Sequence, residues 1–286
     1  MSKQADWLYE IKPKGKFIDL NFKEIWRYRD LLMLFVKRDI VTVYKQTILG
    51  PFWYVIQPLF TSIIFTLIFN TVAGIDTGDG IPPFLFNLAG ITIWTYFKEC
   101  LSGTSSTFRG NAGLFSKVYF PRVIMPLASV ISKLLKFGIQ MAIFLFFYGY
   151  YRYNGWDFGP EPELFLFPVL VITVALFGIG AGMILSSMTT KYRDMTVLIG
   201  FGLQLLMYIS AVMYPVKIVQ ERMPEYDWIV LYNPLSHVIE AFRYITLGAG
   251  MFSYQGVFTA LGLSILIALV GLVIFNRTER SFIDTI

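Results

Sequence analysis

Residues 164–214 read LFLFPVLVITVALFGIGAGMILSSM, then TTKYRD, then MTVLIGFGLQLLMYISAVMY. Two long apolar runs, 164–188 and 195–214, therefore flank six mostly polar residues. Roughly 20 apolar residues cross a hydrocarbon core of about 30 Å as an α-helix. The stretch predicts two membrane-spanning helices joined by a short turn at the membrane surface.

The same pattern recurs along the chain and predicts an all-α, polytopic membrane protein with six transmembrane helices. The composition agrees, because 56% of the residues are hydrophobic and only 15% are charged, against about 25% charged in soluble domains. The composition therefore argues against a soluble fold. The six expected spans are 53–72, 84–103, 130–151, 164–188, 195–214 and 251–275.

Positive charge outside the spans predicts the orientation, because Lys and Arg near span ends stay on the cytoplasmic side. Of the 24 Lys and Arg, 17 lie in the segments that would then be cytoplasmic, and both termini are among these. The opposite segments hold four cations, including Arg243, against nine acidic residues. The basic pI near 9.1 is explained by anionic membrane lipids, and no nucleic-acid partner is expected. Residues 1–50 lack the apolar run of a cleavable signal peptide.

Residues 21–46 alternate apolar and basic side chains at helical spacing. Trp26 lies on the apolar side, and Arg27 and Arg38 are among the cations. Such a pattern is typical of an amphipathic helix that lies in the membrane interface. A cytosolic helix packed on a partner protein is the alternative, and the two can coexist.

The cytoplasmic segment 109–122, RGNAGLFSKVYFPR, predicts a short helix ended by Pro121. Its apolar residues Leu114, Phe115, Val118 and Tyr119 fall at helical spacing beside Lys117. A soluble partner could hold this face in a groove, or the face could pack on the chain's own helices.

Residues 215–250 form a segment that is too long for a connector and too broken by proline for a span. We expect two short re-entrant helices on the outer side, 216–223 and 234–247, because such backbone must be buried in protein or line a cavity. A cap lying flat on the membrane is the alternative. Pro215, Asn233, Pro234 and His237 mark this segment, and a structural role is the favoured interpretation of His237.

The sequence offers no catalytic residue set, no metal site and no cofactor site. It lacks G-x-x-x-x-G-K-[ST], so nucleotide phosphates cannot be held in a P-loop. His237 and Cys100 are its only histidine and cysteine. An ion pair of Glu99 with Lys133 or Lys136 is a more economical interpretation than a transport carboxylate.

Four motifs resemble the membrane subunits of ABC-2 type exporters, specifically permeases for O-antigen, capsule and teichoic acid. Each motif is weak alone, but their order and spacing against six spans cover nearly the whole chain. The motifs are ILGPFW at 48–53 with QPL at 57–59, LFSKVYFPR at 114–122, YRD at 192–194, and MYP at 213–215 followed by YNPL at 232–235.

This resemblance implies a non-enzymatic permease that forms a homodimer in the bacterial cytoplasmic (inner) membrane. A separate ABC ATPase subunit would bind ATP and Mg. Residues 1–50 would carry the interfacial helix, 51–276 the ABC-2 transmembrane domain and 277–286 a cytoplasmic tail. Coupling to the ATPase would involve Leu114, Phe115, Lys117, Val118, Tyr119 and Arg122.

The implied substrate is a lipid-linked polysaccharide, with the O-antigen of lipopolysaccharide first, and the alternatives are a teichoic or capsular polymer, a drug or a small lipid. Aromatic walls suit sugars, which present apolar C–H faces and hydroxyl rims. The aromatic candidates for lining the channel are Trp53, Tyr54, Trp94, Tyr96, Tyr208 and Tyr214, each of which could equally be an interfacial anchor. The cations expected where the lipid head group enters are Arg27, Arg38 and Lys45.

Overall fold

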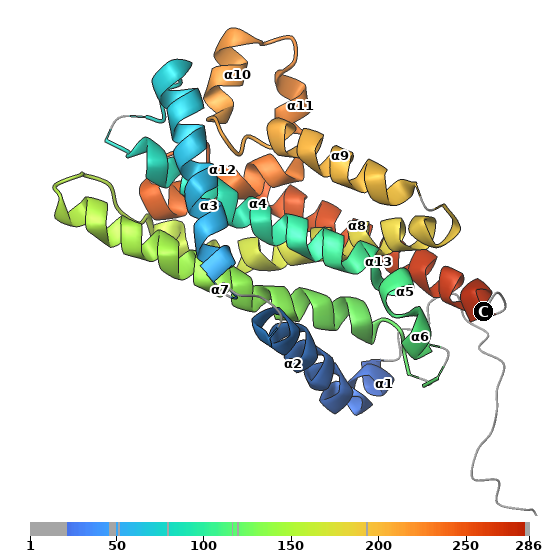
Figure 1. Ribbon diagram of the computed structural model, residues 1–286. Helices are drawn as coiled ribbons and strands as arrows, with labels where there is room; N and C mark the ends of the chain where they lie inside the picture. Colours follow the sequence, from blue (N-terminus) through green and yellow to red (C-terminus); the bar gives the residue numbers. More distant parts are fainter. Residues whose placement is uncertain are drawn as a thin grey trace, which may run out of the picture.

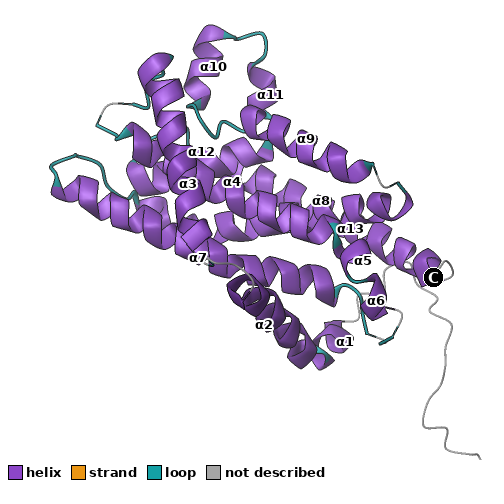
Figure 2. Ribbon diagram, in the orientation of Figure 1, coloured by secondary structure: helices purple, strands orange, loops and turns teal. Residues whose placement is uncertain are grey.

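The computed structural model describes residues 22–45, 50, 52–78, 80–115, 117–118, 120–192 and 194–283. Within these ranges the regular structure is helical throughout (Figure 2). The all-α class predicted from the sequence is therefore confirmed for this part of the chain.

The helices follow one another in the order shown in Figure 1. Their bounds are α1 Phe22–Arg27, α2 Arg29–Lys45, α3 Phe52–Phe65, the π-helix η1 Thr66–Val72, α4 Pro83–Ser105, α5 Thr107–Gly110, α6 Ala112–Phe115, α7 Ile124–Tyr153, the 3-10 helix η2 Pro162–Leu166, α8 Phe167–Lys191, α9 Met195–Ile209, α10 Val216–Arg222, α11 Asp227–Leu231, α12 Pro234–Leu247 and α13 Tyr254–Ile283.

Four segments of the described chain are helical, long and apolar enough to cross a membrane: Phe52–Val72, Ile124–Tyr153, Pro162–Lys191 and Tyr254–Glu279. They correspond to four of the six expected spans. The expected span 84–103 corresponds to α4, and 195–214 corresponds to the 15-residue α9. The count of six therefore stays a prediction.

The helix α4 is the central helix of the bundle. Sixteen of its 23 residues are buried, including Asn87 and Thr92, and it packs against α3, α7, α8 and α12. A helix surrounded by protein does not need the uniform apolar surface that lipid demands, and its polar groups can find partners within the bundle. Asn87, for example, donates hydrogen bonds to Thr66 Oγ1 at 3.0 Å and Asn70 Oδ1 at 2.8 Å.

Small residues let α8 approach both neighbours closely. A Cβ atom added at Gly182 would lie 2.5 Å from Thr104 Cβ on α4, and one added at Gly180 would lie 2.6 Å from the Ala268 Cα on α13. Helix pairs in membranes associate through such backbone proximity. Glycines on different faces of α8 therefore hold α4 and α13 on either side of it.

Cys100 supplies an internal reporter of folding. It is the only cysteine and is fully buried on α4. We expect a thiol-reactive fluorescent maleimide to leave the folded protein in detergent unlabelled and to label it cooperatively on heating, because reaction requires exposure. Rapid labelling of folded protein would contradict this burial, and Cys100→Ser provides the blank.

The N-terminal helices α1 and α2 lie at one end of the bundle, with α2 along the start of α7 (Figure 1). The expected interfacial helix 21–46 is divided in two at Tyr28. Trp26 is 71% exposed, whereas Phe35 and Val36 are buried. The buried side of α2 packs on α7 of the same chain, and contact of the exposed side with lipid or with a partner protein stays a prediction. Residues 1–21 lie outside the described part of the chain.

Candidate functional site

The first candidate site is the break between α9 and α10. The sequence predicted a helix through Tyr214, but α9 ends at Ile209. Ala211 adopts φ 51°, a left-handed conformation that costs a non-glycine residue of order 1 kcal/mol or more and persists only where its surroundings hold it. The helix α9 ends earlier than predicted because the backbone carbonyls that follow it accept hydrogen bonds from a group outside the helix.

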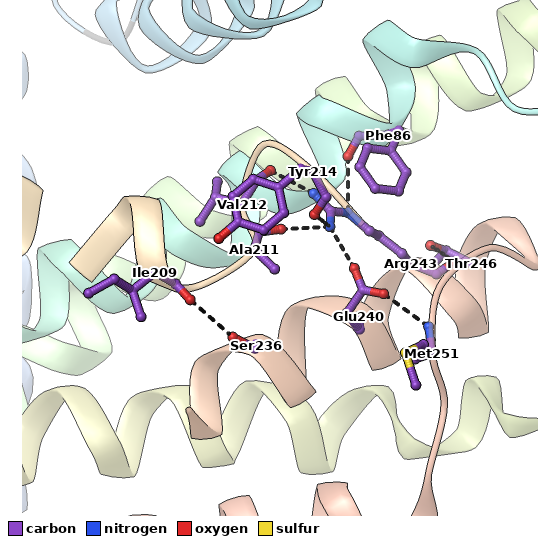
Figure 3. A network of polar contacts seen from close by, with 10 residues as sticks. All are labelled: Phe86, Ile209, Ala211, Val212, Tyr214, Ser236, Glu240, Arg243, Thr246 and Met251. Carbon is purple, nitrogen blue, oxygen red and sulfur yellow. Dashed lines mark hydrogen bonds and ion pairs between the residues drawn. The ribbon is translucent and has the colours of Figure 1, made fainter. Parts of the chain in front are cut away.

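Those partners belong to the guanidinium group of Arg243 on α12, which is fully buried (Figure 3). It donates hydrogen bonds to the carbonyls of Ala211 at 2.8 Å, Val212 at 2.6 Å and Tyr214 at 3.5 Å. It also donates to the Phe86 carbonyl on α4 at 3.3 Å. One side chain thereby ties the break to the first turn of α4 and to α12.

Glu240 balances the buried charge. Its Oε1 accepts from Arg243 at 2.8 Å, and its Oε2 accepts from the Met251 amide at 3.0 Å (Figure 3). Both side chains are almost completely buried. A buried ion pair is tolerated only when its remaining hydrogen-bonding capacity is satisfied, and here the carbonyls and the amide do so. Gly90 leaves space for this group, since a Cβ there would lie 2.5 Å from Arg243 Nη2.

The four residues that marked segment 215–250 all lie around this break. Asn233 caps α12 by accepting from the Leu235 amide at 3.0 Å, and it donates to Ser210 Oγ at 2.9 Å. Pro234 opens α12 and Pro215 precedes α10. His237 lies against Gly256 of α13, where an added Cβ would be 2.6 Å from its Nδ1. The helices begin and end almost where the sequence predicted, but their re-entrant character stays a prediction.

The second candidate site is a cluster of five buried phenylalanines, here called the phenylalanine cluster. Successive ring centroids are 4.4 to 6.1 Å apart, which is the separation of favourable aromatic pairs. The rings form a line of contacts from α13 through segment 107–122 to α2. A displacement of this segment would therefore push on the side chains of both helices. In order, they are Phe275, Phe108, Phe115, Phe120 and Phe35.

Arg122 packs against the phenylalanine cluster. Its guanidinium carbon lies 5.0 Å from the centroid of the Phe115 ring, and its Nη1 donates to the Glu279 carbonyl at 3.0 Å. Arg122 is only 7% exposed. It therefore fixes segment 107–122 to the end of α13, which lies beside α5 and α6 (Figure 1).

The residues predicted to couple to an ATPase divide into two groups by exposure. Phe115 and Arg122 are buried and Leu114 is half-buried, whereas Lys117 and Val118 are exposed. Tyr119 lies outside the described residues. Instead of one short helix ended by Pro121, the segment forms the two single turns α5 and α6. One side of the segment therefore packs on the chain's own helices, as one alternative expected, and the other side is exposed. Docking of a partner on the exposed side stays a prediction.

Glu99 makes the ion pairs expected from the sequence. Its Oε1 lies 2.7 Å from Lys136 Nζ, and its Oε2 lies 3.5 Å from Lys133 Nζ. Lys136 Nζ also lies 4.8 Å from the centroid of the Tyr54 ring. This group joins α3, α4 and α7.

The predicted channel aromatics do not form one continuous surface on a single subunit. Trp53 and Tyr208 are about half exposed, whereas Tyr96 is 2% exposed and its ring packs at a tilt against Phe137, with centroids 4.9 Å apart. Tyr214 donates to the Tyr208 carbonyl at 2.6 Å. Trp94, although mostly buried, lines the groove described next.

A groove of about 740 Å³ lies between α4 and α9, and residues of α5 and the end of α8 complete its walls. Lys98 and Arg109 supply positive charge along it. The sequence placed lipid-head cations elsewhere, at Arg27, Arg38 and Lys45. Arg27 and Arg38 are exposed, Arg38 pairs with Asp39 at 2.8 Å, and the Lys45 side chain lies outside the described part.

Sequence reasoning missed Arg243, which it counted as an ordinary charge of an outer segment. The available signal was the i, i+3 spacing of Glu240 and Arg243, the two residues with charged side chains in a largely apolar helix. Metal chemistry finds no support in the described residues, which contain no group of three or more His, Cys, Asp or Glu able to hold an ion.

Comparison with known proteins agrees with this architecture. The chain is 28% identical over 259 residues to the O-antigen export system permease protein RfbA of Klebsiella pneumoniae, covering 89% of this chain and 94% of the relative. It is 23% identical to RfbA of Myxococcus xanthus, covering 92% and 98% of the two chains. It is 19% identical to the capsule polysaccharide export inner-membrane protein CtrC of Neisseria meningitidis, covering 88% and 92%.

The sequence profile of the ABC-2 type transporter family matches residues 30–247. The match extends from α2 through α12 and so includes segment 107–122 of the phenylalanine cluster and the Arg243 anchor. The chain belongs to the ABC-2 type transporter family of membrane proteins.

Proposed function

We propose that this chain is the channel-forming permease subunit of an ATP-driven exporter that moves a lipid-linked polysaccharide across the cytoplasmic membrane. The observation that carries the proposal is the end-to-end similarity to O-antigen permeases, which spans about nine tenths of both chains. The likeness to a capsule export protein supports a capsular polymer as the second candidate.

ATP hydrolysis is assigned to a separate ABC ATPase, because the sequence has no P-loop of its own. The exposed side of segment 107–122, with Lys117 and Val118, is the proposed docking surface. Movement of the docked ATPase would pass through the buried rings of the phenylalanine cluster to α2 and α13, since close-packed interiors transmit displacement.

A second copy of the chain is proposed to complete the channel. The helices α3, η1 and α9 expose apolar side chains such as Phe60, Leu67 and Phe201. Only 11% of the apolar window of Phe52–Val72 is buried within the subunit. These faces would contact membrane lipids or the partner copy. Six spans per subunit and two cytoplasmic termini complete the proposed topology.

Export of polymer tests this assignment directly. In a strain lacking the chromosomal gene, the wild-type chain supplied together with its ATPase should restore polysaccharide at the cell surface. Surface polymer would be quantified with a polymer-specific antibody. Restored drug resistance without any surface polymer would favour a drug exporter and overturn the polysaccharide assignment.

Val118→Asp tests the proposed docking surface. We expect it to lower export at least about tenfold, because burying the charge in a binding groove costs more than about 1.4 kcal/mol of binding free energy. Val118 is half exposed, so the variant should fold and insert normally. Met223→Asp, at an equally exposed apolar position just after α10, is the matched control for ATPase pull-down. Pull-down unchanged by Val118→Asp would refute the docking surface.

A further inference from the structure

The groove between α4 and α9 consists of two facing stripes of side chains. Along α4 and α5, Trp94, Lys98, Ser102, Ser105 and Arg109 recur at three- to four-residue helical spacing. On α9, the facing stripe runs from Thr196 through Leu203 and Gln204 to Met207. A single continuous surface therefore extends along roughly three helical turns of each wall.

Polarity changes along this surface. Arg109 and Thr196 lie at the end where α9 begins, whereas Trp94 and Met207 lie toward the middle of the bundle. Lys98 lies one helical turn from Trp94, and the hydroxyls of Ser102, Ser105 and Ser106 lie between Lys98 and Arg109. The lining therefore offers hydroxyls with a cation on either side, and an indole and a thioether beyond Lys98. A ligand that matches it carries negative charge at one end and an apolar body behind it.

The cations are in place before any ligand binds. Arg109 Nη1 donates to Thr196 Oγ1 at 2.7 Å, which links α5 to the start of α9. Lys98 is exposed to the groove and makes no ion pair in the described part of the chain. None of the described lining residues is Asp or Glu. Two unneutralised cations beside several hydroxyl donors are suited to phosphate oxygens.

We propose that this groove binds the diphosphate head group of a polyprenyl-type lipid, with Lys98 and Arg109 contacting the phosphates and the apolar end receiving the first part of the tail. The inference rests on the proposed export of a lipid-linked polymer, for which it supplies the point of loading. It places the head group on α4 and α9 and not on α1 and α2.

Binding of farnesyl diphosphate to the full-length protein in phosphatidylcholine nanodiscs tests the site. Lys98→Gln and Arg109→Gln should each weaken binding about tenfold, because each removes one charge-assisted contact. Lys98→Arg should stay within about threefold of wild type. Lys217→Gln removes an exposed cation outside the groove and should change nothing. Affinity unchanged in both groove variants would overturn the proposal.

Two further ligands test separately whether the phosphates and the apolar tail contribute to binding. Farnesol, which lacks the phosphates, should bind at least about tenfold more weakly than farnesyl diphosphate. Inorganic diphosphate, which lacks the tail, should also bind more weakly. Equal affinity for either ligand would overturn a lipid-borne phosphate as the occupant. Thermal labelling of Cys100 verifies that each variant is folded.

Surface polymer measured in cells distinguishes failure of this site from failure of the proposed function. Normal export by Lys98→Gln/Arg109→Gln, with unchanged binding of farnesyl diphosphate, would refute the groove and leave the exporter intact. No export by the wild-type chain with its ATPase would refute the exporter itself.

Discussion

Arg243→Met is expected to lower the free energy of unfolding by about 3–5 kcal/mol, because it leaves Glu240 charged, buried and without its partner. Glu240 is only 2% exposed and keeps just the Met251 amide as a donor. Thermal labelling of Cys100 in detergent provides the measurement. A midpoint within about 1 °C of wild type would show that the anchor is not required for stability.

Two controls separate the ion pair from the backbone anchor. Lys217→Met disrupts the exposed Lys217–Glu221 pair and should change stability by less than about 0.5 kcal/mol. The double variant Arg243→Met/Glu240→Leu should be more stable than Arg243→Met, because no unpaired charge remains. It should still be less stable than wild type, because the carbonyls of Ala211 and Val212 lose their donor. Full recovery by the double variant would mean that these carbonyls contribute nothing.

Gly271→Ala is expected to have the second largest effect, a loss of about 1–3 kcal/mol from overpacking. A Cβ at this position would overlap the Gly180 carbonyl oxygen of α8. The obstacle is backbone and cannot rotate away, so α8 and α13 must separate along their shared contact. Loss of this contact should also lower the amount of folded protein recovered from membranes.

Gly262→Ala on the same helix is the matched control. An added Cβ there meets nothing within 4 Å, so only helix propensity changes, which favours alanine by up to about 1 kcal/mol. The two substitutions should therefore shift the Cys100 labelling midpoint in opposite directions. A shift of the same sign and size in both would show that the α8–α13 contact does not depend on close backbone approach.

Helix positions followed closely from the sequence. The predicted segment 234–247 coincides with α12, and 216–223 differs from α10 by one residue. Prolines and Asn233 specify these boundaries locally, through fixed φ values and a side-chain cap. The sequence also predicted an ion pair of Glu99 with Lys133 or Lys136, because a charge within an apolar helix has few possible partners of opposite sign.

The sequence did not predict which side chains of these helices are buried and which are exposed. Phe115 and Arg122 belong to one motif with Lys117 and Val118, yet the first two are buried and the last two are exposed. Tyr96 and Trp94 are neighbours on α4, but only Trp94 lines the groove. An apolar side chain in a membrane helix can face lipid or protein at similar cost, so hydropathy carries little information about the direction it faces.

The sequence by itself determined that the chain is helical, membrane-embedded and without a P-loop, because apolar length and the absence of a motif are local properties. The tertiary structure alone decided that Arg243 holds the break after α9 and that Lys98 and Arg109 lie along one groove. These groupings join residues that are far apart in the chain, such as Phe86 with Arg243 and Arg109 with Thr196. Their contacts depend on how the helices pack, which no single segment encodes.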